Sequence, residues 1–415
     1  MTWWAPSCTE PIEATVLVPG SKSATARALV LSAIAMGPGS IQGGLLARDT
    51  DLMIAGLKAL GARIDVSDPL RWSIQPIERV PSEAKIDCGL AGTVMRFLPA
   101  LAASGPVRAQ FTGDPAASAR PMEPLVQALS QLGARVDGMH LPFTVAGPVN
   151  HRDVTIDSSA SSQFISALLL AGPRYPSGVR VTHQGGSLPS LPHILMTVAA
   201  LEARGVEVGQ EGSTWETPHS PVKALDEVIE PDLTTAAVFL AAPLVVGGRV
   251  RVPGWPRTSV QPGVRTLDIL TQMGGQVFLG PSSVTVSGTG DISGIDIDLH
   301  DTSELTPVVA ALATLAESPT IIRGVGHIRG HETDRLHALS TEITALGGDC
   351  DETDDGLIIR PRPLHPGIVH TYADHRMAHA GALIGLKIPG VGLDDISCTS
   401  KTMPDFPSTW EAMVS

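Results

Sequence analysis

A pattern that recurs along the whole chain limits its fold more than any other feature. Five amphipathic helical segments each end in a glycine that leads into a short alternating strand, and these glycines are Gly61, Gly133, Gly205, Gly274 and Gly347. Neighbouring glycines are 72, 72, 69 and 73 residues apart. Because a fixed spacing of this kind is typical of repeated supersecondary units, the sequence predicts six copies of a unit of about 70 residues.

A second helix, rich in alanine, opens in the same rhythm. Its six copies begin near positions 21, 91, 160, 232, 304 and 374. These helices are apolar nearly all round, so we expect them inside the protein, with strands and amphipathic helices around them. Each unit therefore has α/β character, and six units of this size predict two domains of three. We place the boundaries so that one domain is 20–230 and the other is 1–19 plus 231–415.

Length and composition limit the number of domains and the classes of partner that the chain can have. A chain of 415 residues is long enough for two or three domains. It carries 29 basic and 42 acidic residues, a formal charge of −13, which argues against nucleic acid or an anionic membrane as a partner. The four cysteines are far apart and lack the spacing of a zinc site or a disulfide framework. Without a recognisable signal peptide or a long apolar run, a soluble cytoplasmic protein is expected.

The segment Pro19-Gly-Ser-Lys-Ser-Ala-Thr-Ala-Arg27 is the first candidate anion site. It joins a strand expected at 15–18 to the first alanine-rich helix. Gly20 permits a sharp turn, and Ser21 or Ser23 can cap the helix. Lys22 and Arg27 add two cations to the positive end of the helix, which favours a phosphate or carboxylate. The spacing is not that of a Walker A loop, and a capped surface helix with Lys22 in water explains this one segment about equally well.

The other alanine-rich helices also begin with unusual polar residues. The openings hold Arg96 in the second, Ser158 to Gln163 in the third, Asp232 in the fourth, Glu304 in the fifth, and Asp374 and Arg376 in the sixth. Ordinary N-capping accounts for each one singly. Six openings at equivalent positions favour helix ends that face a shared cleft between the halves, where the field is positive and suits a substrate with phosphate and carboxylate groups.

Seven segments, taken in order, resemble those of one enzyme family. They are Pro19-Gly-Ser-Lys-Ser23, Leu90-Ala-Gly-Thr-Val-Met-Arg96, Ala119-Arg-Pro-Met122, Ser161-Ser-Gln163, His331-Glu-Thr-Asp-Arg335, Asp374-His-Arg-Met-Ala378 and Cys398-Thr-Ser-Lys-Thr402. Together they resemble the signature segments of 5-enolpyruvylshikimate-3-phosphate (EPSP) synthases over essentially the whole chain. The resemblance implies a two-domain inside-out α/β barrel of six βαβαββ repeats, three per domain, with the active site in the interdomain cleft.

The resemblance also implies an activity, which is transfer of the enolpyruvyl group of phosphoenolpyruvate to the 5-hydroxyl of shikimate 3-phosphate, with release of phosphate. No cofactor and no metal are expected, and the enzyme is expected to be a monomer. The implied shikimate 3-phosphate contacts are Lys22, Ser23, Arg27, Ser161, Ser162, Gln163, Ser190, Glu304 and His331. The implied phosphoenolpyruvate contacts are Lys22, Gly92, Arg120, Gln163, Arg335, Arg376 and Lys401. The implied catalytic residues are Glu304, Glu332 and Lys22.

Some positions are better explained as support, and others depart from the family's usual pattern. Arg96 is interpreted as a surface or supporting residue and His375 as a buried structural histidine. Glu304 stands where the family more often has aspartate, and we expect its longer side chain to reach the same hydroxyl. His331 replaces a usual lysine, which lowers the positive charge and predicts pH-dependent binding near the titration range of histidine. Phe97, after the segment Thr93 to Arg96, replaces a frequent proline.

Two other functions stay open at this point. The sister enzyme, UDP-N-acetylglucosamine enolpyruvyl transferase, resembles this chain in its sixfold architecture. It typically uses a cysteine in the loop before the arginine clamp, and the corresponding segment here, 112–120, has none. A catalytically silent protein that binds phosphorylated metabolites is the other possibility. Against it stand Glu304 and Glu332, because carboxylates weaken simple anion binding.

Overall fold

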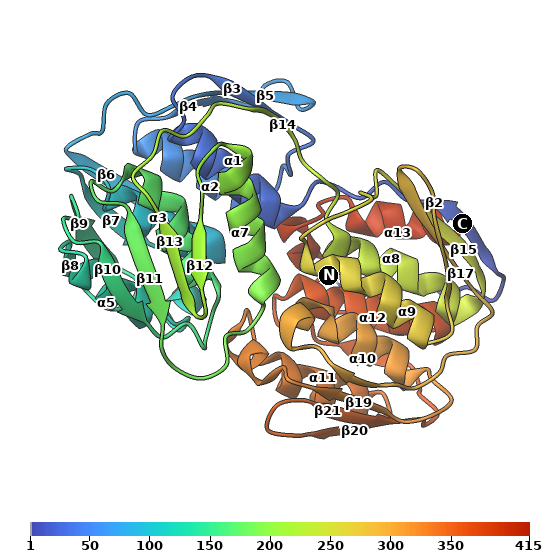
Figure 1. Ribbon diagram of the computed structural model, residues 1–415. Helices are drawn as coiled ribbons and strands as arrows, with labels where there is room; N and C mark the ends of the chain where they lie inside the picture. Colours follow the sequence, from blue (N-terminus) through green and yellow to red (C-terminus); the bar gives the residue numbers. More distant parts are fainter. Residues whose placement is uncertain (1) are drawn as a thin grey trace. The chain divides into compact units, whose positions relative to one another are not determined.

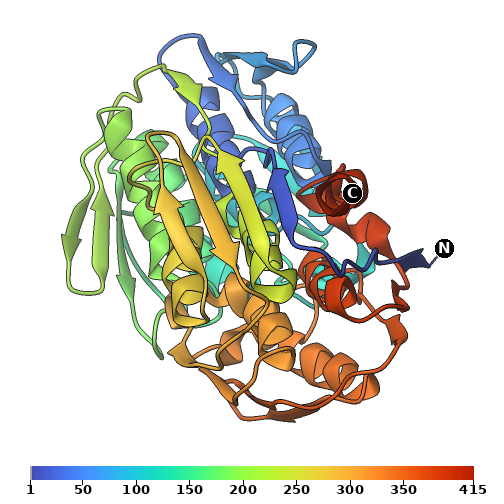
Figure 2. The same cartoon turned by 90° about the vertical axis from the view of Figure 1, so that its right-hand side faces the viewer.

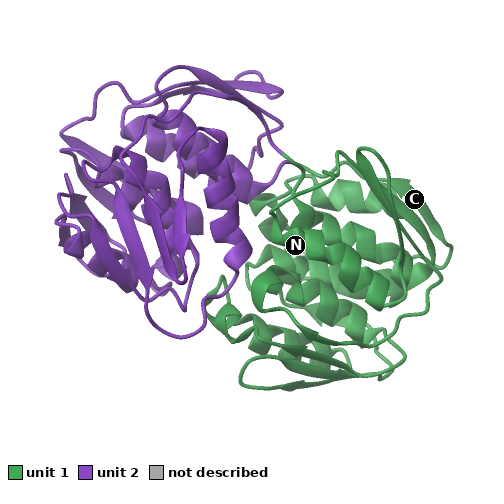
Figure 3. Cartoon of the chain, in the orientation of Figure 1, with its two compact units in different colours: residues 1–19, 230–415 green, residues 20–229 purple. Residues whose placement is uncertain are grey.

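The protein divides into two compact units (Figure 3). The structure is a computed structural model that describes residues 2–415. Unit 1 comprises residues 1–19 and 230–415, and unit 2 comprises residues 20–229. Each unit has its own cluster of buried apolar side chains, so each has a separate hydrophobic core.

Unit 2 is built around three buried helices, with sheets on its outside (Figure 1). The buried helices are α1 (Lys22–Ala33), α3 (Gly92–Ala102) and α6 (Gln163–Ala171). The other helices are α2 (Arg48–Ala59), α4 (Pro115–Ser118), α5 (Glu123–Gln131), α7 (Leu191–Ala203) and the 3-10 turn η1 (Gly172–Arg174). All eleven residues of α3 are buried, which its small and apolar composition permits.

Three four-stranded sheets complete unit 2, and all three have the same topology. The first, in spatial order, is β14 (Asp226–Val228), β3 (Gly39–Gln42), β5 (Arg71–Gln75) and β4 (Arg63–Asp65). The second is β6 (Glu83–Asp87), β7 (Arg108–Thr112), β9 (Phe143–Ala146) and β8 (Arg135–Asp137). The third is β10 (Asp153–Ile156), β11 (Val179–His183), β13 (Thr214–Thr217) and β12 (Gly209–Glu211). In each sheet the first pair is parallel and the other two pairs are antiparallel.

Unit 1 repeats this plan with the buried helices α8 (Leu233–Val246), α10 (Thr306–Thr314) and α12 (His375–Lys387). Its other helices are α9 (Thr266–Gln272), α11 (Arg335–Ala345) and α13 (Phe406–Val414), and its 3-10 segments are η2 (Pro262–Arg265), η3 (His300–Leu305), η4 (Gly326–Gly330) and η5 (Ile396–Lys401). All residues of α8 except the last are buried. The alanine-rich helices therefore lie inside both units, as predicted.

The N-terminal segment completes two sheets of unit 1. In Figure 2 the blue strand β2 (Ile12–Thr15) lies beside β15 (Gly248–Pro253), with which it pairs in parallel. The sheet continues through β17 (Ser283–Gly288) to β16 (Gln276–Leu279). A second sheet is β18 (Asp296–Asp298), β19 (Thr320–Arg323), β21 (Leu357–Arg360) and β20 (Asp349–Glu352), and a third is β1 (Trp3–Trp4), β23 (Val391–Leu393) and β22 (Gly367–Val369). The strand expected at 15–18 therefore lies earlier and ends at Thr15, although the Val16 amide still donates to Arg251 O at 2.8 Å.

The repeated glycines end their helices in the way the pattern predicts. All five have a positive φ, from 78° at Gly205 to 109° at Gly61. At Gly61 an added Cβ would lie 2.4 Å from the carbonyl oxygen of Arg79. The left-handed backbone therefore favours glycine at all five positions, and at Gly61 the close contact requires it as well.

Candidate active site

The first cluster begins at the N-terminus of α1 in unit 2. The Ser21 hydroxyl caps this helix and accepts the Ala24 amide at 3.3 Å. Lys22 Nζ lies 3.3 Å from Oδ2 of Asp49, a carboxylate in the first turn of α2 that is 3% exposed. The side chain of Lys22 is only 19% exposed, so the alternative in which it points into water is wrong. The Asp49 carboxylate instead fixes the ammonium group beside the helix end.

Arg27 is almost fully buried and links α1 to α7. Its Nε donates to Thr197 Oγ1, and its two Nη atoms donate to the carbonyl oxygens of Ser23 and His193, each at 2.8 Å. The guanidinium also lies 5.4 Å from the centre of the Phe97 ring. Burial lowers the pKa of Arg27 to about 9. An arginine has five N–H donors, so the three bonds orient the group and leave two donors for a ligand.

The N-terminus of α3 carries a second group of cations. A Cβ added to Gly92 would lie 2.7 Å from Arg96 Nη1 and 3.1 Å from Arg120 Nη2, so only glycine lets both guanidinium groups come this close. Ala91, the N-cap residue, offers no side-chain acceptor to the first turn. Arg120 is 8% exposed and donates from Nη1 to Leu90 O at 3.0 Å. Unsatisfied helix amides and two arginines at one place form a strong anion site.

The same cluster extends to α6 and to the start of α7. Arg96 Nη1 donates to Gln163 Oε1 at 3.2 Å, and the backbone N–H of Gln163 donates to Ser161 Oγ at 3.3 Å. Arg96 is 2% exposed, so it is a buried support for Gln163 rather than a surface residue. Ser162 is buried beside them. Ser190, the N-cap residue of α7, has φ 53° and is 6% exposed, so the surrounding structure holds this non-glycine residue in a strained conformation.

A separate cluster in unit 1 is organised by Arg335, the first residue of α11. Arg335 Nε and Nη2 donate to the two carboxylate oxygens of Asp374, at 2.7 and 3.2 Å. Nη2 also donates to Glu332 Oε2 at 2.8 Å, and Lys401 Nζ pairs with the other oxygen of Glu332. Burial lowers the pKa of Arg335, but the charges of Asp374 and Glu332 outweigh it and leave the pKa above its ordinary value. Glu332 therefore lies between two cations.

Two further charges belong to this cluster. Arg376, in the first turn of α12, has a lowered pKa because of burial and, to a lesser extent, the charge of Arg335. The charge of Glu304, in η3, opposes that shift and also acts on Arg335, so the three groups share one electrostatic environment. Asp374 accepts the Arg376 amide at 2.9 Å and thereby caps α12. The structure thus brings Glu304, Glu332, Arg335 and Arg376 together with Lys401.

Two histidines near Glu304, His327 and His331, are neutral at ordinary pH. Burial is the main cause that lowers the pKa of His327 to about 4, and burial together with Arg335 holds the pKa of His331 well below its usual range. His331 Nδ1 accepts a hydrogen bond from Arg335 Nη1 at 3.0 Å, which also requires an unprotonated ring nitrogen. The pH dependence expected near the ordinary pKa of histidine is therefore displaced to more acidic pH. His327 Nε2 lies 2.9 Å from Ser303 Oγ and supports the turn that carries Glu304.

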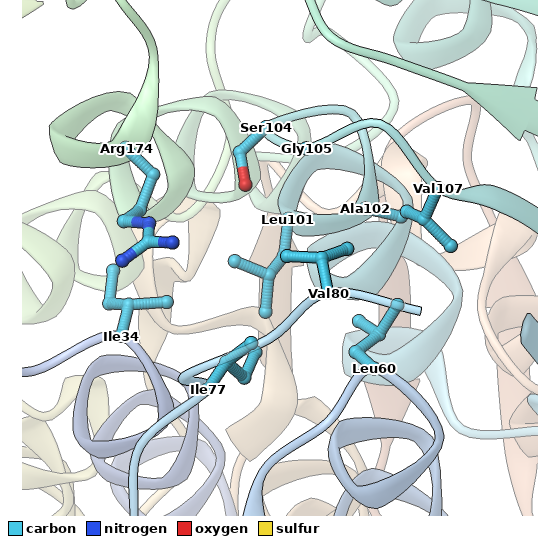
Figure 4. Close-up of a pocket in the computed structure, with 10 residues that line it drawn as sticks. All are labelled: Ile34, Leu60, Ile77, Val80, Leu101, Ala102, Ser104, Gly105, Val107 and Arg174. Atoms are coloured by element: carbon cyan, nitrogen blue, oxygen red, sulfur yellow. The ribbon is translucent and has the colours of Figure 1, made fainter. Parts of the chain in front are cut away.

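A small apolar pocket in unit 2 lies away from these clusters (Figure 4). Its lining residues are Ile34, Leu60, Ile77, Val80, Leu101, Ala102, Ser104, Gly105, Val107 and Arg174. Four of them, Ile34, Leu60, Leu101 and Ala102, lie at the C-terminal ends of α1, α2 and α3, and the others lie in loops or in η1. Lys22 and Gly92, by contrast, lie at the N-terminal ends of α1 and α3. None of the predicted site residues lines this pocket.

Comparison with known proteins gives the family. A family model described as EPSP synthase (3-phosphoshikimate 1-carboxyvinyltransferase) matches residues 7–410. The chain belongs to the EPSP synthase family. It is an enolpyruvyl transferase that acts in the shikimate pathway and joins the enolpyruvyl group of phosphoenolpyruvate to shikimate 3-phosphate. Residues 2–415 contain no cluster of His, Cys, Asp and Glu arranged to hold a metal ion, and none of their helices has the length and apolar character to cross a bilayer.

Solved structures show the same two-domain inside-out α/β fold. An EPSP synthase from Acinetobacter baumannii is 22% identical, with a TM-score of 0.81 over 99% of this chain and 97% of the other. A second structure of EPSP synthase from Acinetobacter baumannii gives a TM-score of 0.80 at 22% identity over 99% and 98%. The enolpyruvyl transferase NikO from Streptomyces tendae is 19% identical, with a TM-score of 0.76 over 98% and 96%. The fold class expected for the EPSP synthase family is confirmed.

Sequence reasoning missed several residues that hold the site in place. Asp49 fixes Lys22, Asp374 fixes Arg335, and Ser303 binds His327. Asp374 stands inside a segment that matches the EPSP synthase signature, so the segment could have indicated it. Asp49 lies in another helix, 27 residues from Lys22, and no local pattern connects the two.

The buried His379 gives a test of the core next to the site. This residue of α12 is 1% exposed and stacks on Phe406 with 4.5 Å between ring centres. Burial, with a smaller effect of the Arg376 charge, lowers its pKa to about 3. Below about pH 6.5 the unfolded chain binds a proton at this histidine that the folded chain does not. The contribution of His379 to the free energy of unfolding is therefore constant above about pH 6.5. Below that pH the free energy of unfolding falls by roughly 1.4 kcal/mol per pH unit.

We expect His379→Leu to remove this acid sensitivity. Between pH 6.5 and 5.0 the wild-type protein should lose roughly 2 kcal/mol more stability than the variant. Amide hydrogen exchange along α12, measured at both pH values, reports the stability of this unit. Equal losses in the two proteins would contradict the assignment of a neutral buried imidazole.

Proposed function

We propose that residues of both clusters together bind each of the two substrates of the reaction, so that both units are needed for turnover. Shikimate 3-phosphate is bound by Lys22, Ser23, Arg27, Ser161, Ser162, Gln163 and Ser190, with Glu304 and His331. Phosphoenolpyruvate is bound by Lys22, Gly92, Arg120, Gln163, Arg335, Arg376 and Lys401. In this proposal the functional domains are 20–230 and 1–19 plus 231–415, and the cleft between them stays a prediction.

One observation carries the proposal more than any other. The missing side chain at Gly92 leaves a place at an uncapped helix N-terminus that two guanidinium groups border. Helix amides and arginines at one point supply directed donors and positive charge, which a phosphate or carboxylate requires.

The reaction needs one base and one acid, and the structure offers a carboxylate for each. We assign Glu304 to accept the proton of the 5-hydroxyl while the oxygen attacks C2 of phosphoenolpyruvate. A proton is added to C3, and the product is a tetrahedral adduct that carries the phosphate. Loss of a proton from C3 and cleavage of the bond from C2 to the phosphate oxygen then give the enol ether and phosphate. Lys22 is assigned to stabilise the phosphate side of this adduct.

Glu332 is the proposed proton donor to C3, and its surroundings indicate how it becomes one. Arg335 and Lys401 both pair with it, which favours its ionised form. The anionic groups of phosphoenolpyruvate compete for the same two cations. Substrate binding therefore weakens the hold on Glu332 and lets it carry the proton that C3 receives.

The proposal also covers the cellular compartment and the oligomeric state of the enzyme. The four cysteines are free thiols, and Cys88 and Cys350 are buried with pKa values raised to about 12 by burial, so they are unreactive. Such thiols fit a reducing compartment, and we propose a cytoplasmic location. We also propose that the enzyme acts as a monomer on small-molecule substrates, without a cofactor.

Replacement of Arg120 by lysine tests the binding assignment. The variant keeps the charge but loses the planar fork, so we expect the dissociation constant for phosphoenolpyruvate to rise roughly ten- to hundredfold. Binding of shikimate 3-phosphate should change far less. Titration calorimetry with each ligand measures both constants. The exposed Arg108 on β7 offers the matched control Arg108→Lys, which should change neither.

Equal weakening of both ligands by Arg120→Lys would contradict the assignment. It would show that Arg120 supports the fold through its bond to Leu90 rather than clamping one substrate.

A further inference from the structure

The loop that leads into α12 has a strained backbone. Tyr372 and Ala373 have φ values of 55° and 54°. In residues 2–415, Ser190 is the one other non-glycine residue with a positive φ. Two successive residues in this region cost free energy that glycine would avoid, and such strain persists only where the surroundings hold it. The segment from His370 to Ala373, between β22 and α12, is called the strained loop below.

The carboxylate of Glu342 accepts two hydrogen bonds from the strained loop. This residue of α11 is 4% exposed. Its Oε2 accepts the His370 amide at 2.9 Å, and its Oε1 accepts the Tyr372 hydroxyl at 2.7 Å. Burial and the bond to Glu342 raise the pKa of Tyr372 to about 12, so the hydroxyl stays protonated and remains a donor. A carboxylate is costly to bury, and apolar side chains fill most of this core, so its presence calls for a specific task.

Two side chains on one face of α11 bind the strained loop and the residue that follows it. Arg335 binds Asp374, which follows the strained loop, and Glu342 is seven residues further along the same helix. Two turns separate these residues, so their side chains project from the same face of the helix. A second carboxylate, Asp394, accepts the amide and hydroxyl of Thr371, each at 2.9 Å, and holds the first half of the loop. Glu342 is the residue that reaches the strained part.

We propose that Glu342 is a positioning residue that keeps the strained loop in place so that Asp374 can orient Arg335 and Arg376 for phosphoenolpyruvate. Asp374 binds the Arg335 side chain through both oxygens and caps the helix that carries Arg376. If the loop relaxes, the Asp374 carboxylate moves and both arginines lose their common support. The inference rests on the proposed function, which assigns these arginines to phosphoenolpyruvate.

The test compares Glu342→Leu with Glu342→Gln. The leucine removes both acceptors and frees the loop, so we expect the KM for phosphoenolpyruvate to rise roughly ten- to hundredfold, with the KM for shikimate 3-phosphate changed less than about threefold. Glutamine is the matched control. Its amide oxygen can accept the His370 amide, and its NH₂ group can donate to the Tyr372 oxygen, so the KM for phosphoenolpyruvate should stay within about threefold of wild type.

A second arm tests the role of strain itself. Ala373→Gly allows φ near 54° without steric cost. Added to Glu342→Leu, it should restore most of the lost phosphoenolpyruvate affinity, because the loop then keeps its shape without the carboxylate. If Glu342→Leu does not fold, Tyr372→Phe removes one of the two bonds without altering the core, and we expect it to raise the same KM about threefold.

Three results would overturn the inference. The first is a parallel rise of both KM values in Glu342→Leu, or in Tyr372→Phe if the leucine variant does not fold. The second is a glutamine variant as impaired as the leucine variant. The third is unchanged amide exchange at 370–374 in the leucine variant, or in Tyr372→Phe in its place. Because the exchange measurement needs no turnover, it still tests Glu342 if the wild-type enzyme fails to release phosphate from the two substrates, which would refute the proposed function instead.

Discussion

Replacement of Glu304 by glutamine is expected to lower kcat by roughly two to four orders of magnitude while shikimate 3-phosphate still binds. The amide keeps the size of the side chain and much of its hydrogen bonding, but it cannot accept the proton of the 5-hydroxyl. The neighbouring His327 is neutral, with a pKa lowered to about 4 chiefly by burial, and His331 is neutral for the same reason. Low pKa values make both imidazoles weak bases, and His327 Nε2 and His331 Nδ1 are already engaged by Ser303 and Arg335. We therefore do not expect either one to replace the carboxylate.

Steady-state kinetics measures kcat, and calorimetry measures the binding of shikimate 3-phosphate. The exposed Glu317 gives a matched control, since Glu317→Gln makes the same chemical change in the same unit and should leave kcat unaltered. A Glu304→Gln enzyme with near-normal kcat, together with a Glu332→Gln enzyme that has lost it, would place the base at Glu332 for both proton transfers.

The second large effect is expected for Glu332→Gln. Without the donor to C3 of phosphoenolpyruvate, kcat should fall by roughly two to four orders of magnitude. Exchange of solvent deuterium into the methylene group of phosphoenolpyruvate should slow by a similar factor, which mass spectrometry of the recovered substrate measures. Phosphoenolpyruvate binding should not weaken, because Arg335 and Lys401 lose the carboxylate that pairs with them in the free enzyme. Deuterium exchange at the wild-type rate would contradict the assignment of the proton donor.

The sequence predicted the plan of the fold because the plan depends on local signals. Helices that are apolar all round must be buried, and α3 and α8 are. A glycine where a helix meets a strand is required by the left-handed turn, and Gly61 has that turn and a carbonyl oxygen 2.4 Å from where a Cβ would lie. The strand expected at 15–18 was misplaced because an alternating apolar pattern does not show where pairing with β15 stops.

The candidate site was predicted less completely, because its supports come from contacts between distant segments. Arg335 and Arg376 belong to segments that match the EPSP synthase signature, but Asp374, which orients both, could be explained as a helix cap and was given no role. Glu342 looks like an ordinary surface residue of an amphipathic helix until its partners, the amide of His370 and the hydroxyl of Tyr372, are known. Backbone strain at Tyr372 leaves no mark in the sequence, since neither neighbouring position holds a glycine.

The central claim is that this chain transfers the enolpyruvyl group of phosphoenolpyruvate to shikimate 3-phosphate. The direct measurement is phosphate release from phosphoenolpyruvate in three parallel mixtures, one with shikimate 3-phosphate, one with UDP-N-acetylglucosamine and one with no acceptor, with the product identified by mass spectrometry. The account predicts stoichiometric phosphate release and an enolpyruvyl product only in the mixture that contains shikimate 3-phosphate. Release only with UDP-N-acetylglucosamine, or binding of both substrates without release in any mixture, would contradict it.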